Sequence, residues 1–471
     1  MSKHRLRVLL VPDSIYWITG TIAKSIARFN PWIEATIASG PVIDKVFADQ
    51  TELMHNFDLV HFTCPYASRE WLPRFLGLVP CVTSHHHVTD WDLIKHNVDG
   101  DAIIVGSPEW AEDLRTRGAD PTKVFCVPYG VDAEQFSPAT DAGRAAIRKK
   151  LDVSPSSTVI GFFGKNSSND DDRKGIDVFT EGILLLKQSL PELTVLIVGP
   201  GWKELVGHLN ASGVRCIWFP YVEDPDGLAE LYHALDFYWV TARIEGGPVT
   251  LLEAMSSEVC CLTTPVGIAR EIVRDGHNAI LLPCNDAQSF VECTRLLAGD
   301  PTEHKRIGAN ARETILQEMH VGITSRRVED VYAKAFENFS SRRQVPLPMD
   351  VHEIAANAID SARPADKREA SIPLEGFPVA IHRRVKMLET LAWSEHLVLY
   401  HEQRAVAFKM IAKEWFRNPL SAQPGRVLLR RFLPVSVVAR VVKLKNRSRL
   451  PVSSYAAQGT QSRRDPMSIE R

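Results

Sequence analysis

Long hydrophobic runs are missing from this sequence of 471 residues. No stretch reaches the ~18–20 uncharged apolar residues that a bilayer-spanning helix needs. The apolar run at residues 8–11 is too short for the core of a signal peptide and predicts a first strand instead. We therefore expect a cytoplasmic protein that is either soluble or bound to a membrane surface.

The sequence also lacks the cysteine spacing of a disulfide framework or a zinc ribbon, and it has no strong excess of one charge. The eight cysteines include no C-x-x-C pair and mostly fall in apolar, strand-like runs, as the reduced thiols of a cytoplasmic protein do. Lys and Arg number 55 against 57 Asp and Glu, a formal net charge of −2, which argues against nucleic acid as a partner. No G-x-G-x-x-G follows the first predicted strand, so the pattern of a nicotinamide-dependent dehydrogenase is missing.

The sequence does contain short apolar runs that alternate with helical patterns, which favours parallel sheets in an α/β fold. These runs are apolar on both faces, as strands covered by helices on each side should be. Two doubly wound domains in tandem would place a ligand in the cleft between them, at the carboxyl ends of the strands. The predicted strands are Leu6–Val11, Leu59–Thr63, Cys81–Ser84, Ala102–Gly106, Val124–Val127, Thr158–Phe163, Leu193–Val198, Arg215–Phe219, Phe237–Thr241, Cys260–Thr264 and Ala279–Leu282.

The segment from Glu245 to Glu253 reads E-G-G-P-V-T-L-L-E and joins a predicted strand to a predicted helix, Pro248–Ser256. Gly246 and Gly247 let a ligand approach the backbone, and proline suits the first position of a helix. The N-terminus of a helix exposes N–H groups and a positive dipole end, which suit a diphosphate. From Pro248 to Glu253 the helix rises about 7–8 Å, so the two carboxylates would meet different parts of one ligand.

This segment and the sequence that follows it, as far as residue 276, resemble the E-x7-E region of retaining glycosyltransferases with the GT-B fold, family 4 in particular. The resemblance covers roughly residues 5–338 and is most specific across 158–283. It implies that Glu245 contacts the donor sugar, that Glu253 binds the ribose, and that Gly246 and Gly247 offer N–H groups to sugar or phosphate. It also implies a nucleoside diphosphate sugar as donor, without a cofactor or a metal. The ordinary alternative for Glu253 is a solvated helix glutamate.

A second candidate segment, Gly161 to Asp177, contains three cations on the donor side. The family carries glycine–arginine and then lysine–glycine here, and the two cations hold the donor diphosphate. Lys165 stands where arginine is usual, and lysine cannot form the bidentate guanidinium fork. Lys174 matches the usual lysine, and Arg173 beside it would shield the acidic residues 170–172. The alternative is an exposed polar loop.

A third candidate lies in P-C-V-T-S-H-H-H, residues 80–87, where family members have a strand that ends in T-x-H. The resemblance implies that one histidine faces the reaction centre, and counting leaves either His85 or His86 for this role. Two alternatives remain: a metal site built from His85, His87, Asp90 or Asp92, and a satisfied loop histidine without chemistry.

The resemblance also orders the chain into parts. We predict a Rossmann-like acceptor-side domain at 1–150, a Rossmann-like nucleotide-sugar domain at 151–320, a return helix at 321–345, and a helical, basic extension with a disordered tail at 346–471. Gly20 lies in the family's acceptor-side loop, but the usual second glycine is absent. The basic and apolar segment 426–449 would lie on an anionic membrane or, equally, form a packed helix pair.

The function implied by the resemblance is retaining transfer of a sugar from a nucleoside diphosphate to an acceptor hydroxyl. Glu245, Lys174 and one of His85 and His86 would be the catalytic positions. The acceptor is a glycan, a lipid or a small molecule, and a role in cell-surface glycan or glycolipid synthesis follows from the basic C-terminal segment alone. The alternatives are another enzyme class on the same fold and a catalytically degenerate module that binds a glycan or a partner.

Overall fold

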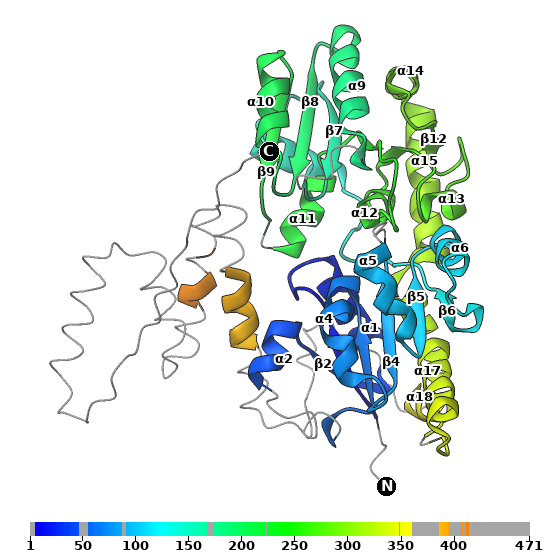
Figure 1. The fold of residues 1–471 in the computed structure, drawn as a ribbon. Helices are drawn as coiled ribbons and strands as arrows, with labels where there is room; N and C mark the ends of the chain where they lie inside the picture. The colour runs from blue at the N-terminus through cyan, green and yellow to red at the C-terminus, as the bar shows by residue number, and fades with distance from the viewer. Residues whose placement is uncertain are drawn as a thin grey trace, which may run out of the picture. The chain divides into compact units, whose positions relative to one another are not determined.

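The computed structural model describes residues 5–46, 55–86, 91–166, 173–222, 224–347, 349–359, 386–394, 407 and 410–413. The chain divides into two compact units, Met1–Trp393 and Ser394–Arg471, and the first of them contains both sheets (Figure 1). The predicted basic segment 426–449 and the acidic residues 170–172 lie outside the described residues.

The first sheet has six parallel strands in the order β2-β1-β3-β4-β5-β6. Side chains alternate between its faces: Ile103 and Val105 pack with α6, whereas Ala102 and Ile104 share a core with α1 and α17. Its strands are β1 (Leu6–Val11), β2 (Ile33–Ile37), β3 (Leu59–Phe62), β4 (Cys81–His85), β5 (Ala102–Val105) and β6 (Val124–Cys126). Its helices are α1 (Ile18–Phe29), α2 (Gly40–Val46), α4 (Pro65–Phe75), α5 (Trp91–Ile94) and α6 (Pro108–Thr116).

The second sheet also has six parallel strands, in the order β12-β11-β10-β7-β8-β9. One face carries α9, α10 and α14, and the other carries α7, α11, α12 and α15. Its strands are β7 (Thr158–Phe163), β8 (Leu193–Val198), β9 (Arg215–Phe219), β10 (Phe237–Val240), β11 (Cys260–Thr263) and β12 (Ile280–Leu281). Its helices are α7 (Asp141–Lys150), α9 (Ile176–Ser189), α10 (Lys203–Ala211), α11 (Pro225–Tyr232), α12 (Val249–Ser256), α13 (Ala269–Ile272), α14 (Ala287–Ala298) and α15 (Pro301–Thr314).

These two sheets confirm the predicted fold class, two Rossmann-like domains with a helical region after them. The helical region after the second sheet is interrupted. A π-helical turn at Ile315–Met319 follows α15, and His320 is extended, with φ −61° and ψ 133°. The chain then continues as α16 (Val321–Thr324), a 3-10 turn and α17 (Val328–Arg343).

The break has a tertiary cause, because two chain crossings between the domains run side by side there. The N–H of Val131 donates to the carbonyl of Met319 at 3.0 Å, and the N–H of Val321 donates to the carbonyl of Val131 at 2.9 Å. Gly130 has no room for a side chain, since a Cβ would lie 2.5 Å from the Cα of Val321. A continuous helix cannot supply these strand-like hydrogen bonds, so the helix stops.

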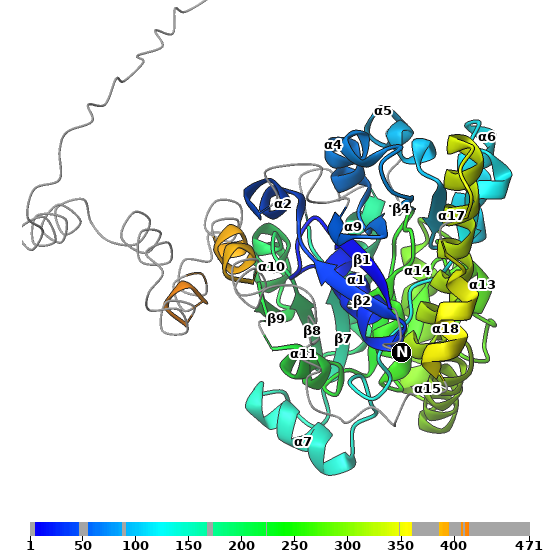
Figure 2. The ribbon, with the colours of Figure 1, turned by 90° about the horizontal axis from the view of Figure 1, so that it is seen from below.

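After the crossing, α17 packs against β4 and β5 of the first sheet, and α18 (Val351–Ile359) lies alongside it (Figure 2). Val328, Tyr332 and Phe336 of α17 belong to the core of the first sheet. Within the described parts of the chain, no helix combines the length and hydropathy that crossing a membrane requires.

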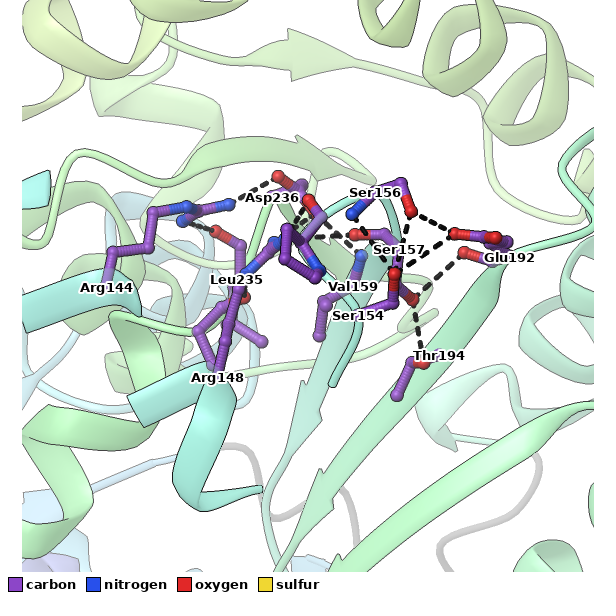
Figure 3. Close-up of polar contacts among 12 residues, drawn as sticks. Arg144, Arg148, Ser154, Ser156, Ser157, Val159, Glu192, Thr194, Leu235 and Asp236 are labelled. Atoms are coloured by element: carbon purple, nitrogen blue, oxygen red, sulfur yellow. Dashed lines mark hydrogen bonds and ion pairs between the residues drawn. The ribbon is translucent and has the colours of Figure 1, made fainter. Parts of the chain in front are cut away.

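A buried ion pair fastens α7 to the second sheet (Figure 3). The Arg148 guanidinium, whose side chain is 8% exposed, lies 2.6 Å from Oδ2 of Asp236 and also donates to the carbonyls of Ala234 and Ser157. The same carboxylate accepts the N–H of Val159 at 2.7 Å. A charge held this deep requires hydrogen-bond partners, and each nitrogen of the Arg148 guanidinium has one.

Candidate donor and acceptor site

The E-G-G-P turn lies between the end of β10 and the start of α12, as predicted from sequence. The helix begins at Val249, one residue later than expected, and Pro248 precedes it with φ −69° while its carbonyl accepts from the N–H of Leu251. Gly267 approaches the turn so closely, with φ +49°, that a Cβ would lie 2.7 Å from the carbonyl oxygen of Glu245. Only glycine fits this position without strain.

Residues of the first domain contact the turn from the opposite side. Trp110 on α6 donates its indole N–H to the carbonyl oxygen of Glu245 at 3.0 Å. Gly106, after β5, leaves only 3.0 Å between an added Cβ and the carbonyl oxygen of Gly246. A Cβ on Gly247 would lie 3.2 Å from the ring of Tyr129. The turn is therefore packed between both domains.

The side chain of Glu245 joins two cations of the predicted donor loop. Its Oε1 lies 2.7 Å from Nη1 of Arg173 and 3.3 Å from Nζ of Lys174, and all three side chains are less than a fifth exposed. The hydroxyl of Thr241 donates to the carbonyl oxygens of Lys174 and Gly175, which fixes the cations to the end of β10. An anion that entered here would meet two positioned cations and would compete with Glu245 for them.

Gly175 allows the backbone before α9 to lie close to Thr241. It has φ +63° and precedes α9, and a Cβ there would lie 2.1 Å from the carbonyl oxygen of Thr241. The sequence pattern Lys174–Gly175 thus has a backbone reason: the residue after the lysine must be glycine.

Lys165 lies apart from this pair in its contacts. Its ammonium is 4.3 Å from the centre of the Trp17 ring, a cation–π contact with the first domain. The preceding Gly164 has φ +142°, and its carbonyl oxygen accepts the indole N–H of Trp202 at 2.7 Å. The three predicted cations are therefore divided between two environments, Arg173 and Lys174 on Glu245, and Lys165 on an aromatic ring.

Glu253 on α12 has an apolar environment. Tyr232, fully buried at the end of α11, donates its hydroxyl to Oε2 of Glu253 at 2.5 Å. Burial raises the pKa of the Glu253 carboxyl to about 7, and the tyrosine hydrogen bond opposes that rise. The pKa of Tyr232 is raised as well, first by burial and then by the charge of Glu253. Glu253 is therefore not an ordinary solvated helix glutamate.

Glu253 lines a cavity of about 430 Å³ between the two domains. The first domain contributes Tyr16 and Tyr129 to the lining, and the second contributes Tyr221. Among the described residues that line it, Glu245 and Lys174 do not appear. The structure thus brings Arg173, Lys174 and Glu245 together in one cluster and Glu253 into the adjoining cavity.

The two candidate histidines face different neighbours, as alternation along β4 requires. His85 is fully buried, and its ring centre lies 5.3 Å from that of Trp110 in an edge-on arrangement. His86 places Nε2 2.9 Å from the carbonyl oxygen of Thr63 and Nδ1 against the hydroxyl of Tyr129. Because a carbonyl only accepts, Nε2 carries a proton, and in neutral His86 the Nδ1 atom accepts from Tyr129.

Both histidines thus contact an aromatic residue that touches the 245–247 turn. The choice between His85 and His86 as the one that faces the reaction centre stays a prediction. The alternative metal site is incompletely described, because His87 and Asp90 lie outside the described residues. The described residues contain no group of three His, Cys, Asp or Glu side chains that could hold a metal ion.

Gly20, predicted to lie in a loop, lies in the first turn of α1, which begins at Ile18. A Cβ on Gly20 would lie 2.5 Å from the backbone of Ile15, so the glycine lets loop 13–17 fold onto the helix. Sequence reasoning missed the aromatic partners Trp110, Tyr129 and Tyr232. Pro-Tyr-Gly at 128–130 was the one local signal, because it marked a turn at the end of a strand.

The chain is similar to known glycosyltransferases in sequence and in fold. Residues 145–314 match the family model described as glycosyl transferases group 1. The chain is 28% identical over 260 residues to a D-inositol 3-phosphate glycosyltransferase of Streptomyces bingchenggensis, which covers 52% of this chain and 55% of that relative. It is 24% identical over 277 residues to a lipopolysaccharide core biosynthesis mannosyltransferase, LpsB, of Rhizobium meliloti, covering 56% of this chain and 74% of the relative.

Among solved structures, the chain is similar to HepE from Anabaena, crystallised in complex with UDP and glucose. The TM-score is 0.59 at 16% sequence identity, over 70% of this chain and 99% of that chain. A likeness at this level of identity shows the fold, which is GT-B. The chain spans about half the length of the first curated relatives it matches.

Proposed function

We propose that this chain is a retaining, family-4-like glycosyltransferase that moves a sugar from a nucleoside diphosphate to an acceptor hydroxyl. The observation that carries the proposal is the cluster of Arg173, Lys174 and Glu245, held beside the turn that starts α12. Two positioned cations at a helix N-terminus suit a diphosphate leaving group. Glu253 lies farther along the same helix, in a cavity that a nucleoside can enter.

Arg173 supplies the guanidinium group that this site otherwise lacks. Where family members have arginine this chain has Lys165, which contacts Trp17. The guanidinium of Arg173, 2.7 Å from Glu245, has the bidentate fork that a phosphate favours. In our proposal Arg173 and Lys174 hold the diphosphate, and Glu245 is released to bind the sugar hydroxyls. Lys165 joins them when the donor enters.

The reaction needs no protein nucleophile in this scheme. The bond between the anomeric carbon and the β-phosphate oxygen breaks, and the acceptor oxygen forms its bond on the same face. The acceptor proton passes to the departing phosphate oxygen. Negative charge grows on the diphosphate, and Lys174 and Arg173 stabilise it from fixed positions, which lowers the barrier without reorganisation. His85 or His86 would face the sugar on the other side of the cleft.

The comparisons suggest where to look for substrates. HepE was crystallised with UDP and glucose and with UDP-glucose, so UDP-glucose is the first donor to try. The curated relatives are named D-inositol 3-phosphate glycosyltransferase and lipopolysaccharide core biosynthesis mannosyltransferase. We therefore propose a glycan, a glycolipid or a phosphorylated polyol as acceptor, and a cytoplasmic enzyme that works at the inner face of the membrane. Segment 426–449 would supply that attachment.

The test is donor hydrolysis by the full chain, with UDP-, GDP- and ADP-sugars and released nucleotide as the readout. We expect slow, donor-selective release that Lys174→Ala and Glu253→Ala abolish. Lys305→Ala, which removes an exposed cation of α15, is the matched control and should keep the activity. EDTA should leave the rate unchanged.

The contrary result is equally clear. If no nucleotide is released and calorimetry detects no binding of UDP, GDP or ADP, the chain is a degenerate module that binds a glycan or a protein partner. If release occurs but survives Lys174→Ala, the assignment of the diphosphate site is wrong.

A further inference from the structure

The helical residues 386–393 belong to the same compact unit as the two sheets, although they follow both domains in the sequence. Most of their side chains are buried. Trp393 is 5% exposed and the carboxyl residue Glu389 is 3% exposed. A helix buried on so many sides is part of a packed interface. The buried members are Met387, Leu388, Glu389, Thr390, Leu391 and Trp393.

Two partners of this helix, Tyr16 and Tyr221, line the cavity. The Trp393 ring stacks on Tyr16 at 5.7 Å, with the two planes 18° apart, and meets Trp17 edge-on at 5.5 Å. The same ring lies 6.1 Å from Tyr221, which follows β9 of the second domain. The hydroxyls of Tyr16 and Thr390 are 2.9 Å apart and hydrogen-bonded. One indole therefore touches both domains.

A second contact fixes the orientation of the helix. Oε1 of Glu389 accepts the backbone N–H of Ser39 at 2.6 Å and the Ser39 hydroxyl at 2.8 Å. Ser39 connects β2 to α2, so the helix is attached to the first sheet at a point separate from loop 13–17. Two attachment points determine how the helix lies on this domain.

Loop 13–17 is itself compact. The Asp13 carboxylate accepts from the N–H of Ser14 at 2.7 Å and from the hydroxyl of Thr19. The loop lacks the paired glycine that shapes the corresponding loop in the family it resembles, and it presents Tyr16 and Trp17 instead. Both of these aromatic residues contact Trp393. In this chain, packing against helix 386–393 thus shapes the loop, whereas in the family the paired glycine shapes it.

The loop also reaches the donor side of the cleft. Trp17 also contacts the Lys165 ammonium, which lies 4.3 Å from its ring centre. The contacts therefore run from Trp393 through Trp17 to Lys165, a cation of the loop after β7. A diphosphate that bound Lys165 would compete with the Trp17 ring for its charge.

We propose that Trp393 is a positioning residue of the acceptor side: it holds loop 13–17 in place against the donor loop that carries Lys165. The C-terminal extension thereby contributes to the reaction cleft through residues 386–393. The consequence for turnover rests on the proposed function, whereas the positioning of the loop does not.

The experiment measures amide hydrogen exchange in the full chain for wild type, Trp393→Ala, Trp393→Phe and Leu391→Ala. We expect Trp393→Ala to raise exchange in loop 13–17 by about tenfold or more, because the loop loses its packing partner. Exchange in Ile176–Ser189 should stay unchanged. Trp393→Phe keeps a ring against Tyr16 and should restore protection. Leu391→Ala is the matched control, since it removes buried volume from the same helix and leaves the indole.

The second readout is donor hydrolysis by the same variants. Trp393→Ala should leave the KM for the donor within twofold and change kcat at least threefold, and Trp393→Phe should recover the wild-type value. Unchanged exchange in loop 13–17, or an equal rise with Leu391→Ala, overturns the proposal. A wild-type chain that hydrolyses no donor and binds no nucleotide overturns the proposed function instead, and the exchange data still decide the role of Trp393.

Discussion

Glu253 provides the sharpest test of the site, because one substitution should change stability and binding in opposite directions. Its carboxyl is held among apolar residues with the Tyr232 hydroxyl as a hydrogen-bond donor, and its pKa is raised to about 7. In the unfolded chain a glutamate titrates near its ordinary value of about 4.3. The native state therefore opposes ionisation of this group.

The sign of the effect on stability follows from linkage. Below the unfolded pKa the carboxyl is protonated in both states, and it imposes no penalty on folding. As the pH rises through the window from about 4.3 to 7, the unfolded chain loses its proton first, and the native state is progressively destabilised. Each unit of pKa difference is worth about 1.4 kcal/mol, so the full penalty above pH 7 is about 4 kcal/mol. This is an upper bound, because Glu253 remains partly open to the cavity.

Glu253→Gln removes the titration and keeps an oxygen for the Tyr232 hydroxyl. The variant should match wild type near pH 3.5 and be more stable by up to about 4 kcal/mol at pH 8. For a domain of this size that corresponds to a rise in Tm of roughly 8–16 °C. Thermal unfolding across the pH range measures it, with Glu292→Gln, an exposed glutamate of α14, as the matched control.

The same substitution should weaken nucleotide binding. A hydrogen bond to a carboxylate contributes about 1.5–3 kcal/mol and one to an amide about 0.5–1.5 kcal/mol, a difference of roughly 1–1.5 kcal/mol. Glu253→Gln should therefore weaken UDP binding roughly five- to tenfold at pH 8. Wild-type affinity should fall as the pH drops below 7. A variant that is no more stable at pH 8 than wild type refutes the raised pKa, and unchanged affinity refutes the ribose contact.

Three further predictions concern other parts of the molecule. Asp236→Ala should destabilise the protein by about 3–5 kcal/mol, because it leaves the buried Arg148 charge without its partner, and adding Arg148→Met should recover much of this loss in thermal unfolding. Tyr129→Phe removes the hydroxyl from the adjacent imidazole and should lower donor hydrolysis roughly three- to tenfold, with unchanged rates as the contrary result. Gly267→Ala forces a Cβ within 2.7 Å of the Glu245 carbonyl and should reduce UDP affinity in calorimetry, whereas normal affinity would show that the turn can relax.

The sequence was sufficient for the central strands because both of their faces are buried. β1, β7, β8 and β9 have the predicted bounds, and the other predicted strands differ by one or two residues at their ends. The missed strand, Ile33–Ile37, lies at the edge of the first sheet and carries Glu34 and Thr36. Its apolar residues alternate with these polar ones, so it is not the continuous apolar run by which most of the other strands were found.

The candidate site shows the same division between local and distant information. Lys174, Gly175 and the 245–253 segment were found because their spacing and backbone demands are local. Tyr232 and Trp110 escaped because their roles depend on where α11 and α6 lie in the fold, and nothing in their own neighbourhood indicates it. The C-terminal extension was predicted to be helical, but the contacts of residues 386–393 were not predicted, since they join residues more than 300 positions apart.

The paired crossings at Val131 and at Met319–Val321 have a mechanical consequence. Hydrogen bonds join the two connections between the domains. We therefore expect the two connections to act together as one hinge. Two separate tethers would permit the domains to slide apart, but a joined pair resists sliding and permits rotation about its own axis. We therefore expect the α12 turn to move relative to His86 and Tyr129 by rotation about this hinge. In such a rotation the far side of the cleft moves most and residues near Gly130 move least.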